Sequence, residues 1–173
     1  MFFYFDEKIK AYEECFQWEQ SLLYLERRYL QRKECSVLNA LVGYSWLYFT
    51  EGPIISGEYE NDANSVSLEY WIKYLGIGRN VADDNPYFNF VAGYTLFFSE
   101  DYLDSRDQNN GKFLMEKCAS MTDDLMLKKL AHNFIQNINS KKHVLLKDGN
   151  AICAHLFSGN SLLEQYFCQI YTS

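Results

Sequence analysis

Two stretches of the sequence, about fifty residues apart, are nearly the same, and this echo constrains the fold more than any other feature. Residues 39–48, NALVGYSWLY, align without gaps on residues 89–98, NFVAGYTLFF. Asn, Gly and Tyr recur at the same places, Ser is matched by Thr, and the flanking positions stay apolar or aromatic. A period of roughly 20–50 residues is typical of stacked repeat units. Because repeat folds offer long surfaces rather than reaction pockets, binding is the first hypothesis for the function.

The spacing of apolar residues predicts helices throughout the chain, and no segment sustains the alternation expected of a strand. We therefore expect an all-α fold: a single domain over 1–173, with antiparallel helical hairpins behind a long N-terminal helix. The last segment reads as one helix or as two pieces broken at Gly159-Asn160. The predicted helices span 6–33, 37–50, 66–76, 86 to about 98–103, 112–120, 123–138 and 151–171.

Local signals suggest where these helices begin and end. Ser36, Asn85 and Ser161 are suited to the N-cap position, and Pro86 to the first helical residue. Glu51-Gly52-Pro53 is expected to stop one helix, and Gly76 with Gly78 the next. Residues 54–63 are then expected to form a loop, and 143–149 an irregular or short extended segment. The two repeated helices are apolar nearly all round, so they should lie buried at the centre.

The second repeat unit resembles a tetratricopeptide helix pair. Its first helix contains Ala92-Gly93-Tyr94-Thr95-Leu96-Phe97-Phe98, and its second contains residues 111–119, GKFLMEKCA. The TPR-like resemblance covers 37–121. It implies that small residues allow close helix approach and that aromatic residues fill the groove between units. The period of about fifty residues is longer than the tetratricopeptide period of about 34.

The composition excludes several classes of partner. The net charge is -7, which argues against binding to nucleic-acid phosphates or anionic membranes. The five cysteines contain no C-x-x-C pair and are expected to be reduced, buried apolar residues. The apolar start lacks a basic n-region, and no apolar run reaches the roughly 20 residues of a membrane span. We expect a cytoplasmic protein.

The negative charge is concentrated in the middle of the chain. Between Glu51 and Asp124 there are fourteen Asp or Glu residues against five Lys or Arg residues. Acids at helix starts have an ordinary capping role, which is the alternative for Asp83, Asp84, Asp123 and Asp124. Seven of the other acids sit inside the stretches that follow the two repeated helices, and we expect those stretches to meet at one edge. The predicted partner-binding residues are Glu58, Tyr59, Glu60, Asp62, Glu100, Asp101, Tyr102, Asp104 and Asp107.

No catalytic motif accompanies this pattern. The sequence lacks H-E-x-x-H, G-x-S-x-G, a Walker loop and G-x-G-x-x-G. His132, His143 and His155 lie on separate predicted segments, and Asp83-Asp84 falls at a helix cap. We therefore expect no catalytic residues, no metal and no cofactor, and the chain is predicted not to be an enzyme.

A small, acidic, aromatic-rich helical chain without catalytic motifs resembles bacterial immunity proteins, including those of contact-dependent inhibition systems. The resemblance implies a partner that is a basic toxin domain, such as a nuclease, which the acidic surface would occlude. A second hypothesis is a TPR-like adaptor that holds a peptide or a helix in an apolar groove. A third is an enzyme with buried carboxylates, which would require a deep pocket with convergent acids.

Overall fold

The computed structural model of the chain describes residues 2–56, 61–99, 110–140, 146, 148–157 and 159–172. Within these ranges, the side chains at 52–56, 61–64, 139–140 and 171–172 are not described. The described secondary structure is entirely helical, which confirms the predicted all-α class. The helices of this part of the chain are α1 Glu7–Glu14, α2 Trp18–Arg32, α3 Cys35–Ser56, α4 Asn61–Val81, α5 Pro86–Phe97, α6 Asn110–Met121, α7 Leu125–Ser140, α8 Gly149–Leu156 and α9 Leu162–Thr172.

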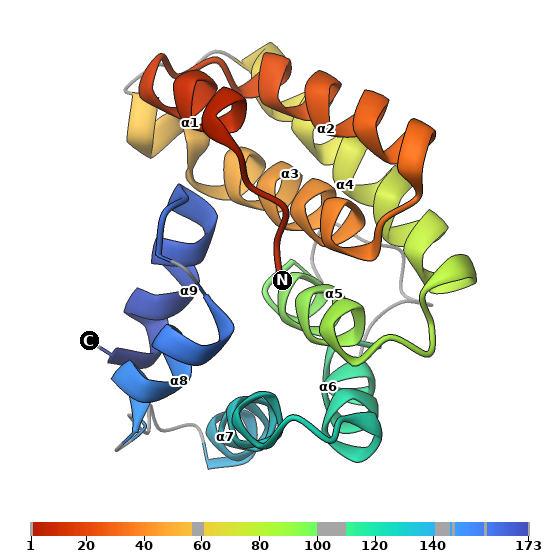
Figure 1. Cartoon of the computed structure of the whole chain (residues 1–173), viewed down its shortest axis with the longest axis vertical. Coiled ribbons are helices and arrows are strands. Elements are labelled where there is room, and N and C mark those ends of the chain that lie inside the picture. The colour runs from red at the N-terminus through yellow and green to blue at the C-terminus, as the bar shows by residue number, and fades with distance from the viewer. Residues whose placement is uncertain are drawn as a thin grey trace.

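The helices follow one another round the fold, so that the last helix, α9, comes back to α3 (Figure 1). α3 is central: it contacts α2, α4 and α5, and α9 packs back against it. α5 in turn packs on α6, α6 on α7, α7 on α8 and α8 on α9. The buried hydrophobic side chains form one continuous cluster to which each of these helices contributes.

The two repeated helices, α3 and α5, lie at the centre of this cluster, as predicted. Tyr44 and Tyr94, the repeated tyrosines, are both buried. The polar residues of the echo are buried too, and their hydrogen bonds stay local or reach the neighbouring backbone. Ser45 donates to the Leu41 carbonyl of its own helix, and the Asn89 amide group donates to the Asp83 carbonyl over 2.9 Å. These partners lower the cost of burying the two side chains, although Asn89 Oδ1 accepts no hydrogen bond from the described residues.

α3 and α5 run parallel, side by side. At their N-terminal halves, Phe2 contacts both: the Asn39 amide donates to the Phe2 carbonyl over 3.0 Å, and the Phe2 ring lies 5.7 Å from the ring of Phe90. At their C-terminal halves, Trp46 Nε1 donates to Ser99 Oγ over 2.7 Å. Because the two starts lie together and so do the later turns, both helices point the same way.

Each of the two packs on the helix that follows it, but the two pairs differ in detail. Gly93 lies against α6, where a Cβ added to it would come 2.9 Å from the Gly111 carbonyl oxygen. Gly43 instead lies against Leu163 of α9 and Phe3, and not against α4. The repeated glycine therefore allows close contact with different neighbours in the two units. The TPR-like repeat over 37–121 stays a prediction.

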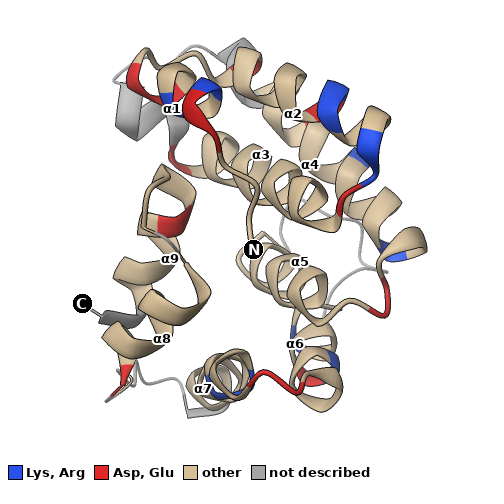
Figure 2. Cartoon of the chain, in the orientation of Figure 1, with Lys and Arg blue, Asp and Glu red and all other residues tan. Residues whose placement is uncertain are grey.

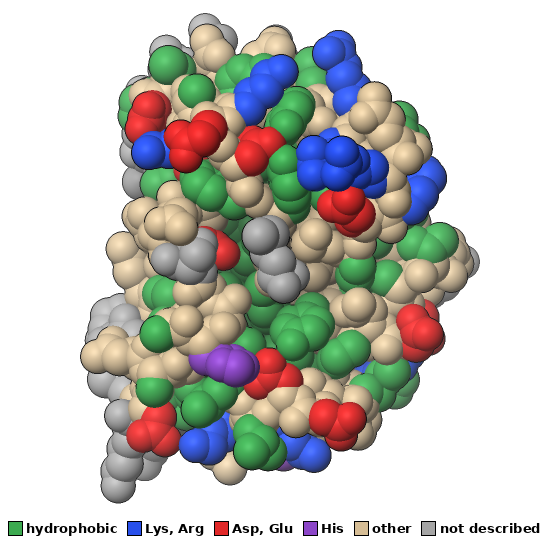
Figure 3. All heavy atoms as spheres, in the orientation of Figure 1, with side chains coloured by type: hydrophobic (Ala, Val, Ile, Leu, Met, Phe, Trp, Pro, Cys, Tyr) green, Lys and Arg blue, Asp and Glu red, His purple; other side chains and the backbone are tan. Residues whose placement is uncertain are grey.

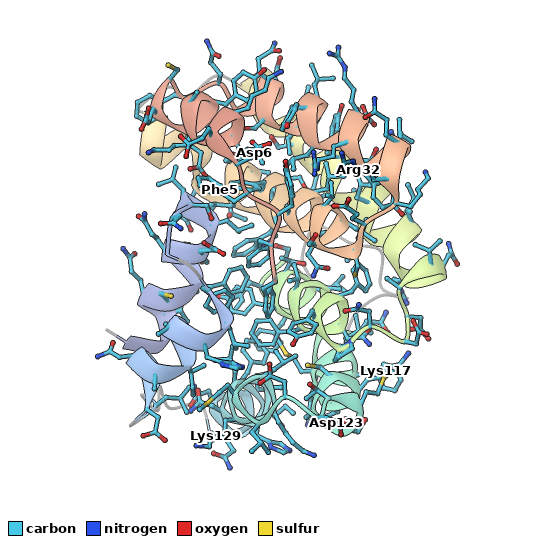
Figure 4. All side chains as sticks on the ribbon, in the orientation of Figure 1. Phe5, Asp6, Arg32, Lys117, Asp123 and Lys129 are labelled. Atoms are coloured by element: carbon cyan, nitrogen blue, oxygen red, sulfur yellow. The ribbon has the colours of Figure 1, made fainter. Side chains whose placement is uncertain are left out.

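An extended N-terminal segment fills the space inside the ring of helices. The Tyr4 amide donates to the Ser36 carbonyl over 3.0 Å, which ties the segment to the start of α3. The Phe3 ring lies 6.0 Å from Phe157 and 5.5 Å from Phe167, so the segment also joins α3 to the C-terminal helices. Figure 4 shows side chains filling the space between α5, α8 and α9, and it labels Phe5 and Asp6 where the segment enters α1.

The predicted single helix over 6–33 is wrong, because α1 ends at Glu14 and α2 begins at Trp18. The two helices bury different stripes: α1 buries Ile9, whereas α2 buries Leu22 and Leu25. A continuous helix could not turn both stripes toward α3, since their phases differ. The break between them lets each helix pack independently.

Two predicted helix stops are also wrong. α3 continues through Gly52-Pro53 to Ser56, and α4 continues through Gly76 and Gly78 to Val81. A proline inside a helix removes one backbone hydrogen bond and disfavours the helix locally, yet α3 continues past it and packs against α4. Gly78 has a packing role: a Cβ there would come 2.1 Å from the Phe88 ring, so its absence lets that ring lie on α4.

The predicted caps hold at two of three places. Asn85 caps α5 by accepting from the amides of Tyr87 and Phe88, with Pro86 at the first helical position. The last segment is two helices, broken at Gly159-Asn160, and Ser161 accepts from the Glu164 amide at the start of α9. Ser36 is not a cap, because α3 already begins at Cys35.

Candidate functional site

Most of the predicted partner-binding residues fall outside the described part of the chain. This holds for Glu58, Tyr59, Glu60, Glu100, Asp101, Tyr102, Asp104 and Asp107, and for the side chain of Asp62. The backbone of Asp62 belongs to α4, and residues 54–56 belong to α3, so the predicted loop over 54–63 is wrong at both ends. The grouping of these side chains at one edge stays a prediction.

The described helices do fix where the two acidic stretches start. α3 and α5 run parallel, so the chain leaves both at the same end of the pair. The two exits are offset along the pair, because Ser99 at the end of α5 pairs with Trp46, and α3 runs on from there to Ser56. That distance is about 15 Å at 1.5 Å per residue.

Two of the four acids assigned to capping have clear structural roles. Asp124 caps α7 by accepting from the amides of Met126 and Leu127, and it also accepts from Tyr87 and His155. Burial alone would raise the pKa of Asp124, but these hydrogen bonds lower it below its usual value. Asp83 forms an ion pair with Lys117. Figure 2 shows acidic residues at the connections before α5 and α7.

The α1–α2 turn, which comprises residues 14–19, is an exposed aromatic and acidic feature. The Phe16 amide donates to the Glu13 carbonyl over 3.1 Å, and the Gln17 amide donates to the Tyr12 carbonyl over 2.8 Å. This pair of bonds is the Schellman ending of a helix, in which glycine is the usual residue at the left-handed position. Phe16 occupies that position with φ of 54°. Left-handed backbone at a bulky residue costs about 1–3 kcal/mol.

The Phe16 ring recovers little of that cost by burial, because the residue is 53% exposed. Its edge contacts Trp18 at 5.5 Å, and Trp18 stacks on Tyr48 of α3 at 4.5 Å. These contacts place the turn against the second half of α3. Glu51 lies one helical turn beyond Tyr48, on the same face, and α3 runs on for about 12 Å beyond Tyr48 to Ser56.

Sequence reasoning missed Phe16, because it placed the residue within the single helix predicted over 6–33. One signal could have revealed the break. The stripe through Ile9, Tyr12 and Phe16 would continue at Glu19 or Gln20, which are both polar, and the aromatic Trp18 lies off that stripe. Such a change of phase marks either a turn or a change of partner.

A second group of polar residues lies buried where α1, α3 and α9 meet. Glu13 is 7% exposed, and its Oε1 accepts from the Tyr44 hydroxyl over 2.7 Å and from the Leu162 amide over 3.1 Å. Burial raises the pKa of Glu13, with a smaller contribution from the nearby charge of Glu164, and the two hydrogen bonds only partly offset this. The carboxyl group thus joins three helices.

We expect Glu13→Gln to stabilise the protein increasingly as the pH rises above 4.5, the ordinary pKa of this group. The folded state holds the Glu13 proton more tightly than the unfolded state, so this group lowers stability as pH rises through its raised pKa. The amide cannot ionise, and its oxygen keeps both hydrogen bonds. Urea unfolding between pH 4.5 and 8 measures this, with Glu69→Gln at an exposed position of α4 as control. If the difference in unfolding free energy between E13Q and wild type does not grow with pH, the pKa of Glu13 is not raised in the folded state.

The third hypothesis, an enzyme with buried carboxylates, needs convergent acids in a pocket. Glu164 and His155 line a hollow of about 400 Å³ together with Phe2, Phe3 and Phe157. Glu13 is absent from its lining, so the two buried carboxylates do not converge there. Among the described residues, no group of three or more His, Cys, Asp or Glu side chains is placed to hold a metal ion. The expectation of no catalysis stays a prediction.

The five cysteines are free, and Cys118 and Cys153 are buried as expected. Burial raises the pKa of Cys35 to about 11 and that of Cys118 to about 12. Cys15, in the α1–α2 turn, is exposed, which corrects the expectation of burial for this residue.

The charged and apolar surfaces are unevenly distributed. Lys and Arg side chains gather over the α2 layer on the face shown in Figure 3, and hydrophobic side chains reach the surface below them. No helix of the described chain is long and apolar enough to cross a membrane. Comparison of the chain with models of protein families, with curated proteins and with solved structures finds no match.

Proposed function

We propose that this chain is a non-catalytic binding protein of the immunity type, which neutralises a basic toxin domain by covering its active site. It would act in the cytoplasm, where the toxin would otherwise reach its target. The observation that carries the proposal is the position of the negative charge: it is concentrated in the two stretches that follow the parallel helices α3 and α5.

The charge count makes this concentration clear. Residues 57–62 and 100–107 contain seven acidic residues and one basic residue, Arg106, within a chain whose net charge is -7. The helical body outside them is therefore close to balanced. Many of its acids have internal roles, such as Asp124 at a helix cap and Asp83 in an ion pair. The excess charge is left for a partner.

The position of the basic residues of α2 also supports a basic partner. The basic residues Arg27, Arg32 and Lys33 lie in the second half of α2 or just after it, roughly 14–22 Å along the helix axis from Trp18, the first residue of α2. At physiological salt, charges screen one another beyond about 8 Å. The basic end of α2 therefore does not neutralise the end where α3 and the α1–α2 turn meet.

Occlusion follows from simple chemistry. A nuclease binds the phosphates of its substrate through basic side chains, and carboxylates of Glu58, Glu60 and Asp104 would occupy that basic surface instead. Tyr59 and Tyr102 would pack between them as anchoring residues, because aromatic side chains contribute most to such interfaces. Opposite charge at long range also speeds association, which suits a protein that must capture a toxin before it acts.

The adaptor hypothesis has weaker support. One hollow, between α4 and α6, is lined by Arg79, Asn80 and Asp83 beside Phe113 and Leu114. A mixed polar lining does not favour an apolar peptide or helix.

The test begins with the proteins encoded beside the gene for this chain. Each is expressed alone and together with the chain, and we expect one basic protein whose toxicity is lost on co-expression. Its association with the purified chain should slow by more than tenfold between 50 and 500 mM salt, as expected for electrostatic steering.

Charge reversal then locates the interface. The triple variant E58K/E60K/D104K should associate at least tenfold more slowly, whereas E116K on the exposed side of α6 should not. If no flanking protein is neutralised, or if the triple variant binds as fast as wild type, the proposal is wrong. Binding unaffected by salt and by charge reversal would instead support the adaptor.

A further inference from the structure

We propose that Phe16 is the anchoring residue of the partner interface, and that the partner therefore has an apolar pocket bordered by basic residues. This inference rests on the proposed function and adds to it a contact outside the acidic stretches. It comes from two properties of one residue in the α1–α2 turn. Phe16 has a strained, left-handed backbone, and its aromatic side chain is exposed.

A residue selected for stability alone would be glycine at this position. Phe16 occupies the left-handed position of a Schellman motif that ends α1, and both hydrogen bonds of the motif are formed. Glycine would form the same two bonds without the steric cost of a side chain. The ring adds strain and stays 53% exposed. Backbone strain that is not offset by burial of the side chain is typical of residues at functional or binding sites.

Comparison with similar residues isolates Phe16. Phe98 and Phe113 are also exposed, but neither has a positive φ. Lys33 shares the left-handed backbone, but its ammonium group lies 4.8 Å from the Tyr29 ring centre, an internal contact that suits a surface lysine. Among the described residues, Phe16 combines strain with an exposed aromatic ring.

The Phe16 ring is supported from within the fold. It packs edge-to-face with Trp18, and the Trp18 ring packs in a tilted arrangement on the buried Tyr48 ring of α3. Trp18 Nε1 is buried without an acceptor among the described residues, a second sign that the turn is not optimised for stability alone. A fixed aromatic ring loses little conformational freedom on binding, which makes it an efficient anchor.

The charges around the ring determine which partner fits. Glu14 and Glu19 flank it on either side of the turn; both are exposed, and neither forms an ion pair with any residue that the structure describes. No Lys or Arg occurs between Lys10 and Arg27. The occupant that fits is thus a basic protein surface with an apolar pocket, which matches the partner proposed for the acidic stretches.

The experiment compares stability and binding in the same variants. In Phe16→Gly and Phe16→Asn, both of which tolerate the left-handed backbone, we expect the melting temperature to rise by about 2–4 °C. Binding to the toxin recovered from the co-expression screen should weaken at least tenfold, mainly through faster dissociation. Phe113→Ala, which removes an equally exposed ring from α6, should leave binding unchanged.

Alkylation of Cys15 provides an independent readout. Cys15 is exposed beside Phe16, so iodoacetamide should modify it in the free chain, and the bound toxin should protect it. If the glycine and asparagine variants are less stable than wild type, or if they bind the toxin as tightly as wild type and Cys15 is not protected, this inference fails.

The triple variant distinguishes this failure from failure of the proposed function. If the Phe16 inference fails while E58K/E60K/D104K still weakens binding, the proposed function survives. If wild type binds none of the screened proteins, both fail. A dimer of the free chain that F16G dissociates would identify a second copy as the occupant and overturn the toxin assignment.

Discussion

Phe3→Ala is expected to lower the free energy of unfolding by about 3–5 kcal/mol, the usual cost of removing a buried phenylalanine ring. Phe3 is 1% exposed and contacts the rings of Phe2, Phe157 and Phe167. Its ring also lies 3.3 Å from the position that a Cβ on Gly43 would take. The substitution therefore leaves a cavity where α3, α8 and α9 converge, and the fixed helices around it cannot close that cavity fully.

Urea unfolding followed by far-UV circular dichroism measures this loss. Phe113→Ala is the matched control, because Phe113 is 59% exposed and its loss should cost no more than about 0.5 kcal/mol. Similar losses in the two variants would show that the N-terminal segment does not hold the C-terminal helices in place.

Gly111→Ala is expected to destabilise the protein by about 3 kcal/mol, at the upper end of the range for overpacked cores. A Cβ at Gly111 would come 2.7 Å from the Phe97 amide nitrogen and 2.8 Å from the Gly93 carbonyl oxygen. Both are backbone atoms of α5, so no side-chain rotation can relieve the overlap. The two helices would have to separate along the contact that joins α5 to α6.

Gly76→Ala is the matched control for Gly111→Ala. Gly76 is exposed inside α4, and a Cβ there would meet nothing within 4 Å. The same chemical change should therefore stabilise the protein by about 0.5–1 kcal/mol through helix propensity. The two variants are expected to move the urea midpoint in opposite directions. A stabilised or unchanged G111A would mean that α5 and α6 are not in close backbone contact.

Some of the candidate site could be predicted from sequence and some could not. The acidic stretches stand out because charge is a property of composition, and Asn85-Pro86 marks the start of α5 because capping depends only on adjacent residues. Phe16 could not be assigned in this way. Its exposure depends on how α1 and α2 each pack on α3, and a short window of sequence does not contain that information.

The ends of the helices also depend partly on local sequence and partly on tertiary contacts. Gly78 in the sequence reads as a helix stop, since glycine has low helix propensity. In the fold it is a helix residue whose missing side chain makes room for the Phe88 ring. Contact with a residue from the next helix outweighs the local preference, and only the tertiary structure reveals that contact.

The sequence by itself determined that the chain is all-helical and that the two Gly-Tyr helices, α3 and α5, are buried. Both conclusions follow from local periodicity and from segments that are apolar on every side. The tertiary structure decided the break between α1 and α2, the place of Phe3 inside the ring of helices, and the different neighbours of Gly43 and Gly93. The reason is physical: these features are set by contacts between residues far apart in the chain, where packing energy exceeds local propensity.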